Sequence, residues 1–185
     1  MAMTETRMTV EDYIDATAGV PEPTQLIDGV MVVNQPRLRH QDAVGMIYRA
    51  LLAWTERHEC RGHVSLPLDV FVDGRNMFGP DVLWYADESR MQIDDYQRGM
   101  PDLVVEVSSP STWHHDVGKK REMYELHGLP ELWLVNTVGC DAQVLRRSRP
   151  SVPSFDVDLK VGYDEVLTSP QLPGFELPLR EVFRL

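Results

Sequence analysis

The stretch PDLVVEVSS at residues 101–109 decides the fold of this 185-residue chain. Its apolar, β-rich run is typical of a central strand that is buried on both faces of a sheet. The sequence predicts a helix next, from about His115 to His127, which Gly128 and Pro130 end as helix C-termini commonly end. We therefore expect a buried strand followed by a helix that packs against it.

The rest of the chain predicts further helices and short strands. Residues 8–16 predict a helix, with Thr9 as its N-cap and Asp12 as the acidic partner of a capping box. Asp28-Gly29 is the dipeptide that a two-residue type I′ hairpin turn prefers. Apolar residues three and four apart predict a long amphipathic helix from Leu38 to about His58. Further strands are expected within residues 63–73 (one strand or a pair), 81–86, 131–136 and 142–148, and meandering β structure is expected within 150–174.

Length and composition restrict the class of protein. The size fits one compact domain over residues 1–185, and 43% hydrophobic with 25% charged residues predicts a folded chain. The net charge of −11 repels phosphate backbones, so nucleic-acid binding would need a local basic groove or a metal ion. Cys60 and Cys140 lie far apart and are expected to be free thiols, and no stretch resembles a signal peptide or a membrane span. We expect a cytoplasmic protein.

Glu106 is the most informative residue, because a carboxylate inside a buried strand needs a compensating partner. The period of two places Asp102, Glu106 and Ser108 on one face of this strand. Asp81 stands at the head of the strand predicted at 81–86. If the two strands pair, Asp81 and Glu106 converge, and a divalent cation such as Mg²⁺ or Mn²⁺ would relieve their repulsion.

The helix after this strand supplies a positive group. Val117, Lys120 and Tyr124 are three and four residues apart, which predicts that Lys120 lies on the inward face and Lys119 points to solvent. Asp116 lies one turn before Lys120 and is expected to orient it or a water molecule. Two carboxylates with a metal ion beside an ammonium group suit phosphodiester hydrolysis. A structural ion pair between Glu106 and Lys120 would give the same pattern without catalysis.

Several motifs together resemble the Uma-two family, a bacterial group with the PD-(D/E)xK restriction-endonuclease-like fold. They are LIDGVMVV at 26–33, PDVLWY at 80–85, PDLVVEVSSPST at 101–112, D(x3)K(x3)Y at 116–124 and GLPELWLVN at 128–136. The resemblance covers nearly the whole chain and implies an α/β fold of the α+β, mixed-sheet kind, with flanking helices and extra β-hairpins.

The resemblance also implies a nuclease site. Asp81 and Glu106 match the two acids of the family pattern, and Lys120 matches a lysine that has moved onto the helix, since Ser108 stands where the (D/E)xK lysine would be. The implied ligands of Mg²⁺ or Mn²⁺ are Asp81, Glu106 and the backbone carbonyl of Val107.

Two positions depart from the family pattern. Gln25 stands where the family often has a glutamate before its hairpin, and Trp113-His114-His115 stands where basic residues commonly precede the helix aspartate. Both changes leave the two acids and the lysine intact. They weaken the expected affinity for a nucleic acid, because part of the local basic patch is lost.

Other candidates have two interpretations each. His40 either lines the cleft from the first long helix, as the family often has it, or lies on the surface. Tyr124 either borders the site or packs between helix and sheet. The cluster of Arg146, Arg147 and Arg149 either contacts phosphates or, as we favour, protects a solvated edge strand. Three aromatic residues are expected in the core and not as platforms for bases: Trp84, Tyr85 and Trp133.

The leading hypothesis is a metal-dependent endonuclease acting on DNA. Asp81, Glu106 and Lys120 would be catalytic, while Asp102, Asp116, His40 and Tyr124 would support them. Cutting both strands would need two sites, so a homodimer is expected. The alternative is a nuclease-fold binding or assembly module without catalysis, in which the acids and the lysine form a buried ion-pair network.

Overall fold

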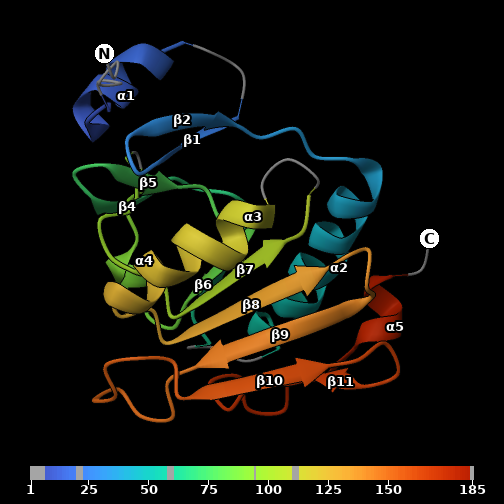
Figure 1. Ribbon diagram of the computed structural model, residues 1–185. Helices are drawn as coiled ribbons and strands as arrows, with labels where there is room; N and C mark the ends of the chain where they lie inside the picture. The colour runs from blue at the N-terminus through green and yellow to red at the C-terminus, as the bar shows by residue number, and fades with distance from the viewer. Residues whose placement is uncertain (1–6, 20–22, 58–60, 94, 110–112, 184–185) are drawn as a thin grey trace.

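The computed structural model describes residues 7–19, 23–57, 61–93, 95–109 and 113–183, which form two main sheets with helices around them (Figure 1). The large sheet has the order β10-β9-β8-β7-β6-β3 and the small sheet the order β2-β1-β5-β4. In the large sheet only β7 and β8 are parallel, so the sheet is mixed, as expected. Two short strands, β11 and β12, form a separate ribbon.

The elements have the following bounds. The large sheet contains β3 (His63–Ser65), β6 (Val82–Tyr85), β7 (Leu103–Val107), β8 (Glu131–Asn136), β9 (Asp141–Arg146) and β10 (Val157–Val161). The small sheet and the ribbon contain β1 (Thr24–Ile27), β2 (Val30–Val33), β4 (Val70–Asp73), β5 (Asn76–Phe78), β11 (Val166–Leu167) and β12 (Leu177–Pro178). The helical segments are α1 (Val10–Thr17), α2 (Leu38–Thr55), η1 (Glu88–Arg90), α3 (Trp113–His115), η2 (Asp116–Lys120), α4 (Arg121–Leu126) and α5 (Leu179–Val182).

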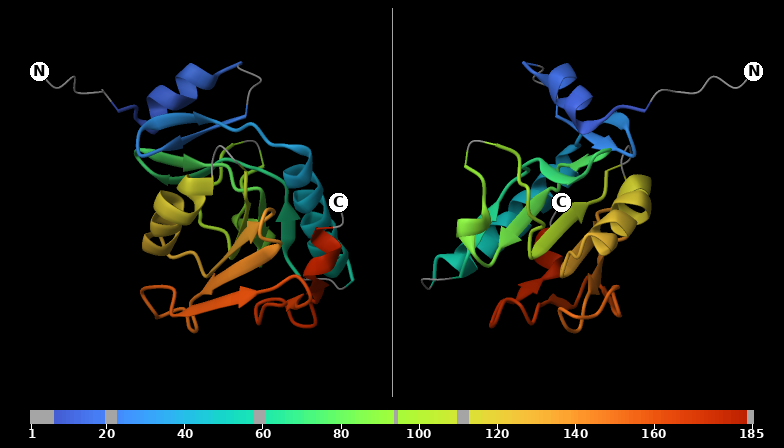
Figure 2. Two further views of the ribbon diagram at one scale, coloured as in Figure 1. Left: turned by 45° about the vertical axis from the view of Figure 1, so that its right-hand side comes forward. Right: turned by 90° about the vertical axis from the view of Figure 1, so that its left-hand side faces the viewer.

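The side chains of β7 alternate between two layers of the core, one on each face of the large sheet. Figure 2 shows α2 and α5 on one side of this sheet and α4 on the other. Leu103, Val105 and Val107 face α2 and α5 and belong to the larger apolar cluster. Val104 faces the other way, toward α4 and the small sheet, in a second cluster. Every residue of β7 is buried. Because Glu106 shares the face of Val104, the strand carries its carboxylate into the layer that α4 covers.

Local signals that the sequence predicts are confirmed. The Thr9 hydroxyl accepts a hydrogen bond from the Asp12 amide, and the Asp12 carboxylate accepts one from the Thr9 amide, as a capping box requires. Asp28 and Gly29 have φ angles of 50° and 73°, the positive values that a type I′ turn needs. The long helix α2 ends at Thr55, three residues before the expected His58, which itself lies outside the described residues.

Two expectations about the strands are wrong. The stretch 63–73 contains two strands, but they do not pair with each other: β3 joins the large sheet and β4 the small one. Strand β9 is not an edge strand, because β10 pairs with it.

Arg147 lies just beyond β9 and donates to the carbonyls of Leu129, Val152 and Glu125, so its role is structural. Arg146 and Arg149 line a surface cleft together with Arg147.

The remaining expectations concern cysteines, aromatic residues and membranes. Cys140 is a free thiol, while Cys60 lies outside the described residues. Trp84, Tyr85 and Trp133 are buried in the core, as expected. Within the described part of the chain, no helix is both long and apolar enough to cross a membrane.

Another buried carboxylate, that of Glu131, fastens the C-terminal tail to β8. It accepts hydrogen bonds from Trp133 Nε1 (2.7 Å), Ser169 Oγ (2.7 Å) and Gln171 Nε2 (3.2 Å). We expect Glu131→Gln to lower the free energy of unfolding by about 1–3 kcal/mol, because the new amide group would face donors where an oxygen now accepts. Chemical denaturation would measure this, with Glu122→Gln on the exposed side of α4 as the control. A loss no larger than that of the control would contradict the role of Glu131.

Candidate active site

Asp81 and Glu106 face each other across neighbouring strands. Val82 pairs with Val105 in the antiparallel ladder of β6 and β7, so Asp81 and Glu106 occupy the next opposed positions. The side chains of such a pair share one face and lie close together. Both are buried, and Asp81 Oδ2 accepts a hydrogen bond of 2.7 Å from the Val107 amide. The predicted convergence of the two acids is therefore present.

Lys120 reaches the same place from the helix. Its ammonium group lies 2.5 Å from Glu106 Oε1 and 3.1 Å from Asp116 Oδ1, and its side chain is 1% exposed. The Tyr124 hydroxyl donates to Glu106 Oε1 at 2.7 Å. Phe78 closes the site from the small sheet, with its ring centre 5.7 Å from Lys120 Nζ and 5.3 Å from the Tyr124 ring. One cation is thus enclosed by carboxylates and aromatic rings.

A π-helical turn, η2, produces this arrangement. In a regular α-helix, residues eight apart such as Asp116 and Tyr124 differ by roughly 80° around the axis. The wider π turn reduces this angle, so Asp116, Lys120 and Tyr124 all point at the sheet and are buried. The expectation that Val117 lies on the inward face is wrong, because Val117 is 38% exposed. Lys119 is partly exposed, which agrees with the expectation that it points to solvent.

Burial and neighbouring charges shift the protonation of the site. Burial, with a smaller contribution from the Asp116 and Asp81 carboxylates, raises the pKa of Glu106 to about 8 against the opposing effect of Lys120. Burial opposes the charge on Lys120, but Glu106 and Asp116 outweigh it and raise the lysine pKa above its ordinary value. Burial and Glu106 hold the pKa of Tyr124 well above 10, so its hydroxyl stays a donor. Lys120 therefore remains a cation, while Glu106 loses its proton in a pH range in which enzymes commonly work.

His40 and Gln25 connect the acids to an open cleft. His40, on the first turn of α2, is 5% exposed, and its Nε2 lies 3.2 Å from Asp81 Oδ1. Gln25 on β1 is buried and accepts a hydrogen bond of 3.5 Å from the Gly79 amide. Together with Asp81 these residues line a cleft of about 620 Å³. Of the two interpretations of His40, the structure thus favours the one that places it at the cleft.

Asp69 also lines this cleft, and sequence reasoning missed it. Burial raises the pKa of its carboxyl group. A lone acid in the apolar stretch LPLDVFV at 66–72 is the signal that could have identified it.

Asp102 and Ser108 share the face of Glu106 in the strand pattern but do not join its cluster. Both Asp102 carboxylate oxygens accept hydrogen bonds from Arg90, and the Ala86 amide donates to one of them. Asp102 therefore anchors the η1 loop at the far end of β7, which corrects its expected supporting role. Ser108 Oγ accepts a hydrogen bond from the Thr137 amide at 2.8 Å and so ties β7 to the end of β8.

The site offers hard oxygen donors for a divalent cation. Among the described residues, no three His, Cys, Asp or Glu side chains converge in a geometry that would hold a metal ion. Mg²⁺ nevertheless commonly binds through one or two carboxylates and completes its shell with water. Asp81 and Glu106 are two opposed buried carboxylates and meet this requirement. The donor set therefore fits Mg²⁺ or Mn²⁺.

A family model described as "Uma2: Putative restriction endonuclease" matches residues 10–180, almost the whole chain. The chain belongs to the Uma2 family. A solved structure, described as a "putative nuclease belonging to DUF820 from Anabaena variabilis", shares the fold of this Uma2 protein with a TM-score of 0.75 and 17% identity, over 96% of this chain and 98% of the other. No curated protein matches the sequence significantly.

Proposed function

We propose that this Uma2 protein is a metal-dependent endonuclease that hydrolyses phosphodiester bonds of DNA. One observation carries the proposal: the fully buried Lys120 ammonium lies 2.5 Å from Glu106, which sits opposite Asp81 at the wall of an open cleft. Buried titratable groups with strongly perturbed pKa values beside a cleft, here Glu106 and Tyr124, are typical of active sites. The description of the family as a restriction endonuclease supports the same activity.

Each residue has a distinct part in this proposal. Asp81, Glu106 and the Val107 carbonyl would hold Mg²⁺ or Mn²⁺, which when bound lowers the pKa of water and neutralises phosphate charge. Lys120 positions the attacking water and stabilises the negative charge that develops on the phosphate. Asp116 and Tyr124 are positioning residues, since they fix the Lys120 ammonium and the Glu106 carboxylate.

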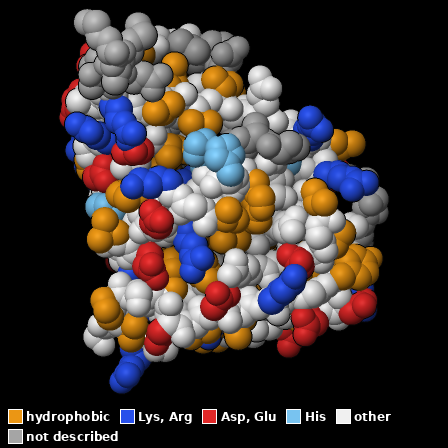
Figure 3. Space-filling model, viewed as in Figure 1, with side chains coloured by type: hydrophobic (Ala, Val, Ile, Leu, Met, Phe, Trp, Pro, Cys, Tyr) orange, Lys and Arg blue, Asp and Glu red, His pale blue; other side chains and the backbone are white. Residues whose placement is uncertain are grey.

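The surface restricts how DNA binds. On the face shown in Figure 3, lysine and arginine side chains are interspersed with acidic ones and form no continuous basic surface. With a net charge of −11, affinity must come from a few local contacts and the metal ion. We further propose a homodimer, since two sites would cut both strands; light scattering on the purified protein would test it by the molar mass.

A binding or assembly module without catalysis remains the second candidate. The feature that favours it is that Lys120 is already paired with two carboxylates. Calorimetric titration with Mn²⁺ separates the two candidates. An enzyme should bind the ion and lose this binding on Asp81→Asn or Glu106→Gln, whereas a closed ion-pair network should release or absorb no heat of binding.

Cleavage of plasmid and single-stranded DNA is the direct test. With Mg²⁺ or Mn²⁺ the wild type should cut and with EDTA it should not, while Glu106→Gln should reduce the rate at least about a hundredfold through loss of a metal ligand. Glu122→Gln, which also removes one carboxylate but on the exposed side of α4, should cut as the wild type does. Equal rates for wild type and Glu106→Gln would refute the assignment of the site.

A further inference from the structure

A second cleft, of about 830 Å³, meets the first one at His40. We call it the α2 cleft; its walls include Arg37, Arg39, His40, Ser108, Trp113 and Asn136. It runs from the first turn of α2, past the ends of β7 and β8, to the start of the α3 helix. Because His40 lines both clefts and contacts Asp81, a ligand in the α2 cleft would lie next to the acidic site.

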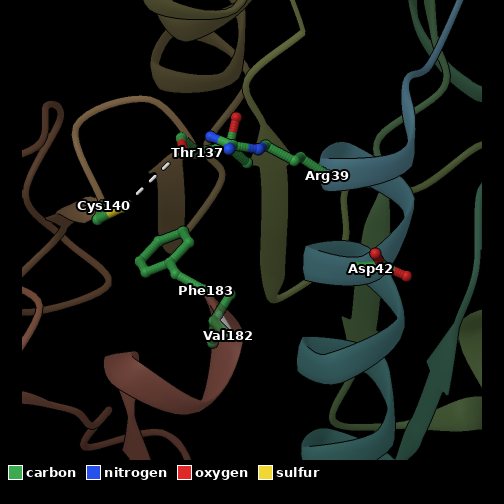
Figure 4. Close-up of a pocket in the computed structure, with 6 residues that line it drawn as sticks. All are labelled: Arg39, Asp42, Thr137, Cys140, Val182 and Phe183. Carbon is green, nitrogen blue, oxygen red and sulfur yellow. Dashed lines mark hydrogen bonds between the residues drawn. The ribbon is translucent and has the colours of Figure 1, made fainter. Parts of the chain in front are cut away.

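The α2 cleft has a local positive charge that the overall composition conceals. Arg37 and Arg39 are exposed, and neither forms an ion pair with a described residue. Arg37 caps α2 without a side-chain hydrogen bond, and the first turn carries no acid, so the amides of this turn add partial positive charge. Figure 4 shows Arg39 extending from α2 toward Thr137, which lines the same cleft.

An independent observation at His40 also points to a ligand. While Nε2 lies beside Asp81, the Nδ1 atom is buried and has no hydrogen-bond partner in the described part of the chain. Buried polar atoms of folded proteins are seldom left without a partner. A water molecule that accompanies a bound phosphate would supply one, because water can donate to Nδ1.

Trp113 gives the α2 cleft an apolar wall. The indole is partly exposed and packs beside the cluster that contains Leu134, which holds it in place. Aromatic side chains beside arginines are the usual means of holding unstacked bases and their phosphates. A cleft of this volume matches a small ligand such as a nucleotide, whereas a base-paired helix is too wide for it.

We propose that the α2 cleft binds the nucleotide next to the scissile phosphate, in a DNA strand that is single or locally unpaired. Arg37 and Arg39 contact phosphates, and the base lies on Trp113. This inference rests on the proposed function and names its substrate: unpaired DNA is bound in preference to duplex. It also explains how a chain without basic residues before Asp116 still attracts a phosphate backbone.

Fluorescence anisotropy in EDTA tests the proposal without cleavage. The probes are a labelled 12-nucleotide single strand and the same sequence as a duplex, titrated with full-length protein over a range of KCl concentrations. The wild type should bind the single strand more tightly. Arg37→Gln with Arg39→Gln should reduce the slope of log affinity against log salt by about 1.4, which is two phosphate contacts at about 0.7 each.

Matched variants make the result specific. Arg146→Gln with Arg149→Gln removes the same charge from another cleft and should leave the slope unchanged. Trp113→Leu should weaken single-strand binding about tenfold, and Trp113→Phe should restore most of it, which excludes misfolding as the cause.

Three results would overturn the proposed subsite. The two double arginine variants could lower the salt slope equally, the Arg37→Gln with Arg39→Gln variant could keep the wild-type slope, or the wild type could show no preference for the single strand. Failure of the proposed function looks different. In that case the binding results hold as expected, but no metal ion supports cleavage.

Discussion

Replacing Lys120 with methionine should abolish metal-dependent cleavage and lower the free energy of unfolding by about 3–5 kcal/mol. The ammonium group is fully buried between Glu106 and Asp116, so its removal leaves carboxylates without a counter-charge in the protein interior. Cleavage should fall at least about a hundredfold, because the group that stabilises charge on the phosphate is lost. Initial cleavage rates and urea denaturation followed by tryptophan fluorescence would measure the two effects.

A double variant separates the stabilising role of Lys120 from its catalytic role. Glu106→Gln combined with Lys120→Met removes both partners of the closest contact, so it should regain at least half of the lost stability and remain inactive. Lys119→Met is the matched control, since this partly exposed neighbour should change stability by less than about 0.5 kcal/mol. A stable single Lys120→Met variant would contradict the ion pairs, and an active one would contradict the catalytic role.

The features that the sequence predicts well are local. A capping box, a type I′ turn and an unbroken apolar strand are each specified by residues within a few positions, and all three are present. The meeting of Asp81, Glu106 and Lys120 was also predictable, because buried charges in an apolar strand and on an inward helix face must pair with each other.

The features that the sequence does not predict depend on tertiary contacts. Strands of three residues, such as β3 and β5, are too short to show periodicity, so their partners follow only from packing. The π turn changes the phase of the helix, and Val117 therefore points outward. A period of two places Asp102 on the face of Glu106 but says nothing of Arg90, which binds Asp102 at the far end of β7.

Without divalent metal, the stability of the wild type should fall as pH rises from about 5 to 8. Burial raises the pKa of Glu106 from 4.5 to about 8, so within this range the folded protein holds a proton that the unfolded chain has released. Since the folded state binds more protons, the free energy of unfolding decreases with pH, by up to about 1.4 kcal/mol per unit. The contribution is complete below 4.5 and is lost as pH passes 8. Denaturation in EDTA at several pH values would measure it.

Glu106→Gln is the control for this pH dependence, because the amide does not titrate between pH 5 and 8. A plot of its free energy of unfolding against pH should therefore lack the slope that Glu106 gives the wild type. Coincident curves would show that Glu106 does not bind the proton. Addition of Mn²⁺ then distinguishes the two candidate functions. A metal ligand must be ionised, so an enzyme should gain stability from Mn²⁺ and should gain more as pH rises. A closed ion-pair network would show the same loss with pH in EDTA but no gain from Mn²⁺, since Lys120 would keep the place of the cation.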